Sequence, residues 1–155
     1  MGEGACGELA ALCALEIDAA NSYETGVRNI EVYEIRERAG VFLSDHYRSI
    51  NELSQLIERL GGAPPVDMPS AGPITGALRN VAPEERTESV LSDLLLNEQI
   101  LVRAYGCAQE LRPGDEAERL IAGIRGEEEG HIAYLQNALD RRLWENLPEY
   151  HRTNR

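Results

Sequence analysis

Residues 121–135 read IAGIRGEEEGHIAYL, and two of the polar residues in this stretch stand at positions that should be buried. The apolar residues recur at steps of three and four, which is the spacing of one face of an α-helix. Glu128 and His131 are three residues apart and fall on that same face, so both side chains are expected to point into the protein. The whole face consists of Ile121, Ile124, Glu128, His131, Leu135 and Ala138. This pattern predicts a helix over about residues 116–143 that carries an acid and an imidazole toward a core.

Three other segments show helical spacing of apolar residues and complete the predicted fold. They cover about residues 6–28, 31–60 and 84–111. Residues 61–83 contain five prolines and four glycines, which are too many helix breakers for an interior element. We therefore predict one all-α domain over residues 1–155, a four-helix bundle in which a long crossover at 61–83 joins two helical hairpins. Residues 148–155 are expected to form a flexible tail.

The composition disfavours several classes of partner. A formal net charge of −12 argues against binding to nucleic acid or to anionic lipid, because either requires a concentration of cations. Apolar runs such as residues 91–96 are interrupted by charge well before the length of a membrane-spanning helix. The first seven residues show neither a basic start nor an apolar stretch. We expect a soluble, cytoplasmic protein without a membrane span.

The three cysteines point to no redox or iron–sulfur motif. Cys6, Cys13 and Cys107 form no Cys-x-x-Cys pair, so the sequence encodes neither a disulfide framework nor a rubredoxin-type iron site. We expect buried free thiols.

A glutamate also lies inside the apolar stripe of the first and third predicted helices. Glu16 precedes Tyr23 by seven residues, and Glu98 precedes Tyr105 by the same interval. A single glutamate on an apolar stripe is usually a boundary residue whose carboxylate reaches solvent. The repetition of the spacing favours a shared role in the core instead. Both tyrosines would pack in any bundle, with their hydroxyl groups requiring a partner.

The second predicted helix supplies a histidine at the position that corresponds to Glu128. When Leu53 is aligned with Leu135, His46 matches Glu128 and Ser49 matches His131. Three glutamates and two histidines would then converge on stripes that carry no Arg or Lys. An ionised carboxylate in a bundle core is costly unless it is paired or bound to a cation, and a divalent metal ion is the simplest compensation. The predicted metal ligands are Glu16, His46, Glu98, Glu128 and His131.

The two Glu-plus-Tyr helices and the Glu-x-x-His of residues 128–131 resemble the ferritin-like superfamily, nearest to its small rubrerythrin-like members. The likeness covers about residues 8–143. Residues 45–53, followed by LGGAPP at 60–65, are similar to the second helix of bacterial ferritin-like proteins, in which this segment commonly reads DHxxH. The resemblance implies metal ligands at Glu16, Glu98, Glu128 and His131, with Tyr23 and Tyr105 near the metal.

The chain departs from the superfamily's pattern in the second helix. His46-x-x-Ser49 stands where the superfamily has Glu-x-x-His, which removes one ligand and exchanges a bridging carboxylate for an imidazole. A full di-iron site, one iron or zinc ion, and an asymmetric pair completed by water, Asp45 or Glu52 all remain open. The implied cofactor is iron, with manganese or zinc as alternatives.

These features predict a metal-binding protein of oxidative-stress protection, with oxygen or peroxide as its partner. Carboxylate ligands and open coordination positions favour oxidation of Fe(II) or reduction of peroxide, the chemistry of a ferroxidase or a peroxidase-type oxidoreductase. The alternative is a non-enzymatic structural or stress-associated bundle with a degenerate metal site, and the sequence does not decide between them. An oxidase of an organic substrate would need an apolar channel to the metal. An apolar outer face at Val32, Ile35 and Val41 favours a homodimer.

Overall fold

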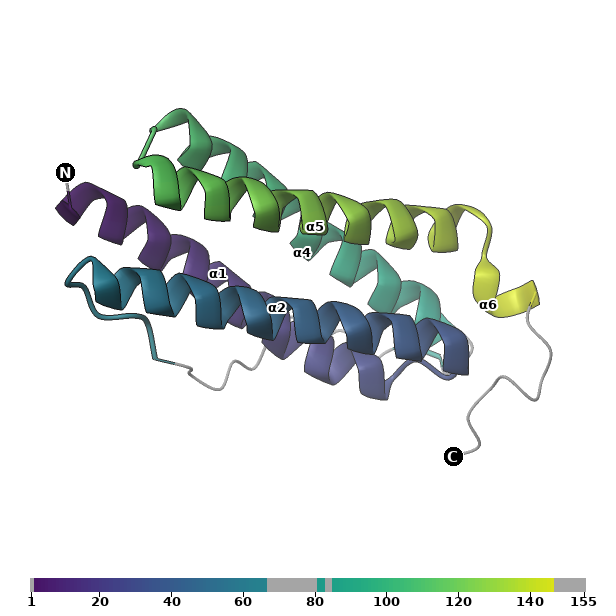
Figure 1. Ribbon diagram of the computed structural model, residues 1–155. Coiled ribbons are helices and arrows are strands. Elements are labelled where there is room, and N and C mark those ends of the chain that lie inside the picture. The colour runs from purple at the N-terminus through teal and green to yellow at the C-terminus, as the bar shows by residue number, and fades with distance from the viewer. Residues whose placement is uncertain (1, 67–80, 83–84, 147–155) are drawn as a thin grey trace.

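The computed structural model describes residues 2–66, 81–82 and 85–146, and within these ranges every regular element is a helix. Most of the predicted crossover at 61–83 and the predicted tail at 148–155 lie outside the described residues. The all-α four-helix bundle expected from the sequence is confirmed (Figure 1). The helices are α1 (Gly2–Arg28), α2 (Tyr33–Arg59), α4 (Arg86–Glu110), α5 (Asp115–Asp140) and the short α6 (Leu143–Asn146).

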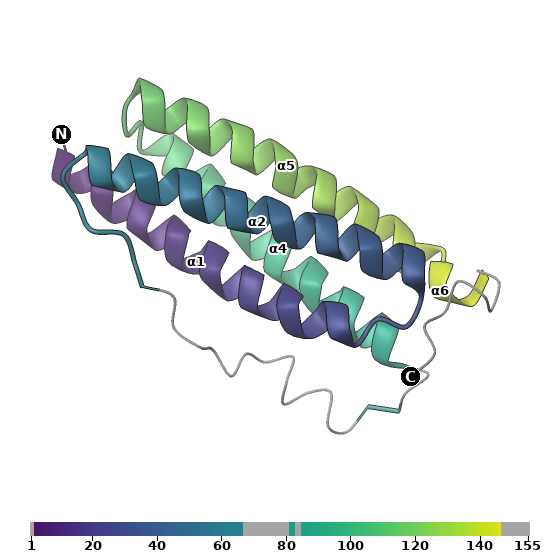
Figure 2. The ribbon, with the colours of Figure 1, turned by 60° about the horizontal axis from the view of Figure 1, so that its bottom comes forward.

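The four long helices form two antiparallel hairpins, α1 with α2 and α4 with α5, which pack side by side (Figures 1 and 2). Between the hairpins, α2 runs antiparallel to α5, because Arg59 pairs with Glu116 and Arg48 pairs with Glu127. In both views the end of α2 and the start of α4 lie at opposite ends of the bundle. This arrangement requires the long connection between the hairpins that the proline- and glycine-rich region predicts.

The helix ends follow local chemistry. After α2, Gly61 takes a φ of 87°, and the amide of Gly62 donates a hydrogen bond of 2.9 Å to the carbonyl of Ile57, which is the glycine stop that the sequence predicts. Gly114 precedes α5, and Asp115 is its first residue, where a carboxylate stabilises the positive end of the helix dipole.

Several predicted boundaries shift by a few residues. α1 begins at residue 2 rather than 6, and α2 begins at residue 33 rather than 31. α5 ends at residue 140 rather than 143, because Arg142 has a positive φ of 45° that interrupts the helix before α6. α1 continues through Gly26 as far as Arg28. A β-carbon at Gly26 would lie 3.0 Å from Val90, so this glycine allows α1 to approach α4 closely.

The core consists of two apolar clusters, one toward each end of the bundle. One includes Leu9, Leu12, Leu53, Leu101 and Ile121, and the other includes Ile30, Phe42, Leu91, Leu94 and Leu135. Polar residues that are equally buried lie at the helix turns between these two clusters.

Two expectations about the surface are corrected. Val32 and Ile35 are buried in the core, and only Val41 is exposed, so these three residues do not form an apolar outer face. Of the thiols expected to be buried, Cys13 is buried, Cys6 is partly exposed and Cys107 is exposed, and all three are free.

Candidate metal centre

The five residues predicted as metal ligands meet in the middle of the bundle. α1, α2 and α4 contribute one residue each and α5 contributes two, and none of the five side chains is more than slightly exposed. Each lies on the inner face of its helix, with a buried residue one turn before it and another one turn after it. The five residues are Glu16, His46, Glu98, Glu128 and His131. We refer to them as the central cluster.

His46 lies between three carboxylates of the central cluster. Its Nδ1 is 2.7 Å from Oε2 of Glu16, and its Nε2 is 2.9 Å from Oε1 of Glu98. Oε1 of Glu128 lies 3.5 Å from the Nδ1. The imidazole of α2 therefore links the glutamates of the other three helices.

His131 uses its two nitrogens differently. Its Nδ1 faces the cluster, 3.1 Å from Glu98 and 3.2 Å from Glu128. Its Nε2 faces away and lies 2.9 Å from Oδ2 of Asp45. Asp45 is partly exposed and also pairs with Arg48, so His131 connects the buried cluster to the surface.

The interaction of Asp45 with His131 is not predicted by the sequence, which suggests Asp45 only as an additional ligand. In the structure the carboxylate of Asp45 contacts the His131 nitrogen that points away from the cluster. The available signal is the position of Asp45 on α2 next to His46, opposite the histidine of an antiparallel α5.

The two tyrosines cross-link the repeated helices. Tyr23 of α1 donates a hydrogen bond of 2.5 Å to Glu98 of α4, and Tyr105 of α4 donates one of 2.6 Å to Glu16 of α1. The equal Glu-to-Tyr spacing in the sequence thus becomes a reciprocal pair of hydrogen bonds. Both hydroxyl groups are buried and satisfied, and each holds one carboxylate in place.

Protons are held tightly by this cluster. Burial alone would lower the pKa of His46, but hydrogen bonds to Glu16 and Glu98 and the nearby carboxylate charges outweigh it and raise the pKa to about 10. The pKa of His131 is also raised, because its hydrogen bond to Glu98 and the charge of that carboxylate outweigh burial. Burial, together with a hydrogen bond to Glu98, raises the pKa of Glu128 to about 12. Without a metal ion, bound protons therefore bring the net charge of the cluster close to zero.

The donor set fits a metal ion. One ligand atom from each of His46, Glu98, Glu128 and His131 lies within 4.8 Å of the other three. Oε2 of Glu98 is buried and has no hydrogen-bond donor among the described residues, as expected for a carboxylate oxygen that faces a cation or a shared proton. Imidazole nitrogens and carboxylate oxygens together suit iron, manganese and zinc. The buried cluster fits a ferritin-like metal site.

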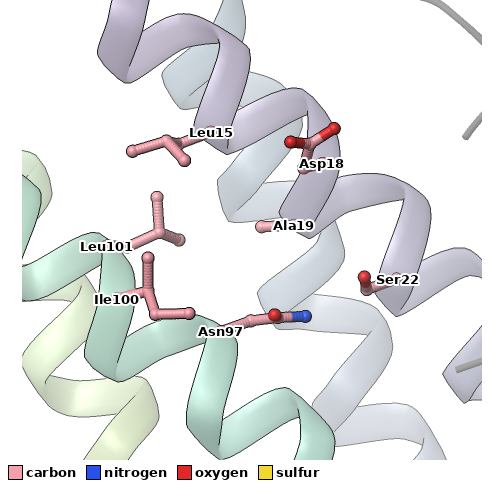
Figure 3. Close-up of a pocket in the computed structure, with 7 residues that line it drawn as sticks. All are labelled: Leu15, Asp18, Ala19, Ser22, Asn97, Ile100 and Leu101. Carbon is pink, nitrogen blue, oxygen red and sulfur yellow. The ribbon is translucent and has the colours of Figure 1, made fainter. Parts of the chain in front are cut away.

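A hollow of about 250 Å³ opens on the surface between α1 and α4. In Figure 3, α1 lines one side of it with Leu15, Asp18, Ala19 and Ser22, and α4 lines the other with Asn97, Ile100 and Leu101. Its lining contains no residue of the central cluster, and Leu101 is itself a buried core residue. The hollow therefore lies beside the turns that carry Glu16 and Glu98 without reaching their carboxylates.

Comparison with solved structures places the fold. The chain is similar to the bacterioferritin of Desulfovibrio desulfuricans, with a TM-score of 0.77 over 97% of this chain and 85% of that one, at 19% sequence identity. The fold is that of the ferritin-like four-helix bundles. That bacterioferritin has a diiron site, which its X-ray structures capture in different catalytic states. No family model and no curated protein matches the sequence, so nothing supports the rubrerythrin-like subgroup in particular. Within the described residues, no helix is both long and apolar enough to span a membrane.

Proposed function

We propose that this chain binds iron in the central cluster and is a ferritin-like metalloprotein that oxidises Fe(II) or reduces peroxide. The observation that carries the proposal is the convergence of three glutamates and two histidines in the core. The sequence contains no lysine, and no arginine of the described ranges pairs with these glutamates. Such a set of buried acids requires protons or a metal ion for compensation. The residues that would form the metal site are Glu16, His46, Glu98, Glu128 and His131.

The surrounding residues would fix the ligands and limit access of water. Iron, when bound, supplies one-electron chemistry between its two common oxidation states. Tyr23 and Tyr105 hold the carboxylates of Glu98 and Glu16. The apolar clusters on either side exclude bulk water, which strengthens every electrostatic interaction inside the site. Protons released from the cluster can leave through Nε2 of His131 to the carboxylate of Asp45, which reaches the surface.

The remaining parts of the proposal concern the identity of the metal, the biological role, the location and the oligomeric state. The diiron bacterioferritin favours iron over manganese or zinc, although the donor atoms suit all three. We further propose the sequence-based assignments of a rubrerythrin-like role in oxidative-stress protection, a cytoplasmic location and a homodimer. Sedimentation velocity tests the last of these, because a monomer at micromolar concentration would exclude it.

One observation favours a second candidate, a non-enzymatic structural or stress-associated bundle with a degenerate metal site. The two histidines are hydrogen-bonded to carboxylates at both nitrogens, and Glu128 retains a proton. Protons alone can therefore balance most of the buried charge. In this case the cluster would specify the pairing of the helices rather than hold a metal.

Anaerobic loading with Fe(II) separates the two candidates. The purified protein is incubated with Fe(II), desalted and analysed for iron, and is then exposed to oxygen or to peroxide while the absorbance of Fe(III) is followed. The control is the Glu98→Ala, Glu128→Ala double variant. Bound iron that is lost in the control and that oxidises faster than free Fe(II) supports the proposal. Absence of bound iron in both proteins supports the structural bundle.

A further inference from the structure

The dimensions of the central cluster correspond to one metal ion. Ligand atoms bound at about 2.0–2.2 Å lie within about 4.4 Å of one another around a single ion. Two ions about 3.5–4 Å apart would spread their outermost ligands over roughly 8 Å. The four ligand atoms of His46, Glu98, Glu128 and His131 lie within 4.8 Å. A small inward movement brings them to the size of one coordination sphere.

Glu16 is the one member of the central cluster that is absent from this group of four. Its Oε1 accepts the hydrogen bond of Tyr105, and its Oε2 contacts Nδ1 of His46. Both oxygens are therefore engaged. Glu98, by contrast, keeps Oε2 without a donor from any described residue. The two glutamates occupy equivalent positions in the repeat, but only Glu98 has a carboxylate oxygen available to a metal ion.

Each histidine directs one nitrogen toward Glu98 and the other toward a carboxylate outside the group of four. His46 places Nε2 toward Glu98 and Nδ1 on Glu16, and His131 places Nδ1 toward Glu98 and Nε2 on Asp45. An imidazole that gives its N–H proton to a carboxylate presents the lone pair of its other nitrogen to a metal. Glu16 therefore orients the imidazole of His46 in the same way as Asp45 orients that of His131.

The inner face of α2 contributes one imidazole and no carboxylate to the central cluster. Ser49, buried next to the cluster, lacks an imidazole at the position that would complete a second Glu-x-x-His. His46 stands at the position of the glutamate in that Glu-x-x-His motif, and its Nδ1 contacts the carboxylate of Glu16. Among the described residues, the four side chains of this group form the one set of three or more potential ligands close enough to share a metal ion.

We propose that the central cluster is a mononuclear site with two histidine and two glutamate ligands, His46, Glu98, Glu128 and His131. In this site Glu16 is a positioning residue that orients His46 rather than a metal ligand. The inference rests on the proposed function, since it assigns roles within the same metal site. It differs from a diiron arrangement in the number of ions and in the role of Glu16.

Cobalt(II) titration of the full chain tests the assignment without measuring catalysis. Ions bound per chain are counted by native mass spectrometry, and the visible absorption bands of cobalt report its ligands. Wild type is expected to bind one ion. Glu16→Gln and Asp45→Asn form a matched pair, and each is expected to keep one ion with a similar spectrum and to lose about 10- to 100-fold in affinity. Glu128→Gln removes a ligand and is expected to change the spectrum. Circular dichroism of each variant verifies folding.

The outcomes separate this inference from the proposed function. Two ions in wild type and one in Glu16→Gln would overturn the mononuclear assignment and leave the metalloprotein proposal standing. One ion in wild type, with Glu16→Gln altering the spectrum as Glu128→Gln does, would make Glu16 a ligand and also overturn it. No bound ion in wild type would overturn both. The count in wild type depends on no variant, so a variant that fails to fold does not prevent the decision.

Discussion

Metal binding to the central cluster is predicted to release about two to three protons per ion at pH 7. His46 and Glu128, with pKa values of about 10 and about 12, both carry a proton at this pH in the metal-free protein. A bound ion requires the carboxylate form of Glu128 and a free imidazole nitrogen on His46, so both protons must leave. His131, whose pKa is raised from 6.5, is also partly protonated and releases a fraction of a third proton.

The sign of the pH dependence follows from these raised pKa values. Protons compete with the metal more strongly as the pH falls, so affinity must rise with pH. Two displaced protons correspond to a rise of about 100-fold in affinity per pH unit below the lower of the two pKa values.

In the metal-free protein, groups with raised pKa values stabilise the fold most at low pH. That contribution begins to fall near pH 4.5 for Glu128 and near pH 6.5 for His46, and it is lost as the pH rises toward about 12 and about 10.

Isothermal titration calorimetry with zinc(II) in two buffers of different ionisation enthalpy measures the number of protons released. Glu128→Gln serves as the control, because it cannot release the carboxyl proton and should lower the count by about one. Thermal melting of the metal-free protein should show a lower melting temperature at pH 9 than at pH 6. A proton count near zero, or an affinity that is flat between pH 6 and pH 7.5, would refute the reasoning about the protonated cluster.

Four further predictions concern the hydrogen bonds, the packing and the metal content of the protein. Tyr23→Phe and Tyr105→Phe each remove a buried hydrogen bond to a carboxylate and should lower the free energy of unfolding by about 1.5–3 kcal/mol, measured by urea denaturation. Leu101→Ala deletes a buried side chain beside the α1/α4 hollow and should cost about 2–5 kcal/mol in the same assay; a loss under 0.5 kcal/mol would contradict the packing described. The double variant His46→Glu, Ser49→His restores a second Glu-x-x-His and should raise the metal count to two per chain, whereas an unchanged count would contradict the explanation for the missing second position. Metal at 100 times its dissociation constant should stabilise wild type by about 2.7 kcal/mol, and removal with a chelator should reverse the shift in melting temperature.

The fold and the meeting of the central cluster are predictable because they depend on periodicity. Apolar residues at steps of three and four define which face of each helix is buried, and Glu16, Glu98, Glu128 and His131 fall on those faces. Antiparallel hairpins then bring the middle turns of the four helices to one level. The position of His46 follows from aligning the second helix with the fourth.

Other features depend on three-dimensional contacts that periodicity does not contain. Asp45 is one position away from the inward-facing His46, and its contact with His131 depends on how closely α2 approaches α5. The burial of Val32 and Ile35 depends on the turn between α1 and α2, where the helical phase is interrupted. The end of α5 depends on a positive φ at Arg142, which no glycine or proline signals. Each of these follows from geometry between segments rather than from residue type.

The most direct test of the metal site is a crystal structure of the iron-loaded protein with anomalous diffraction recorded on both sides of the iron absorption edge. The account predicts one iron peak per chain, within bonding distance of His46, Glu98, Glu128 and His131, with Glu16 on the far side of His46. Two peaks in the cluster would contradict the mononuclear assignment. A cluster without any peak, with iron bound only at surface carboxylates, would contradict the claim that these buried residues form a metal site.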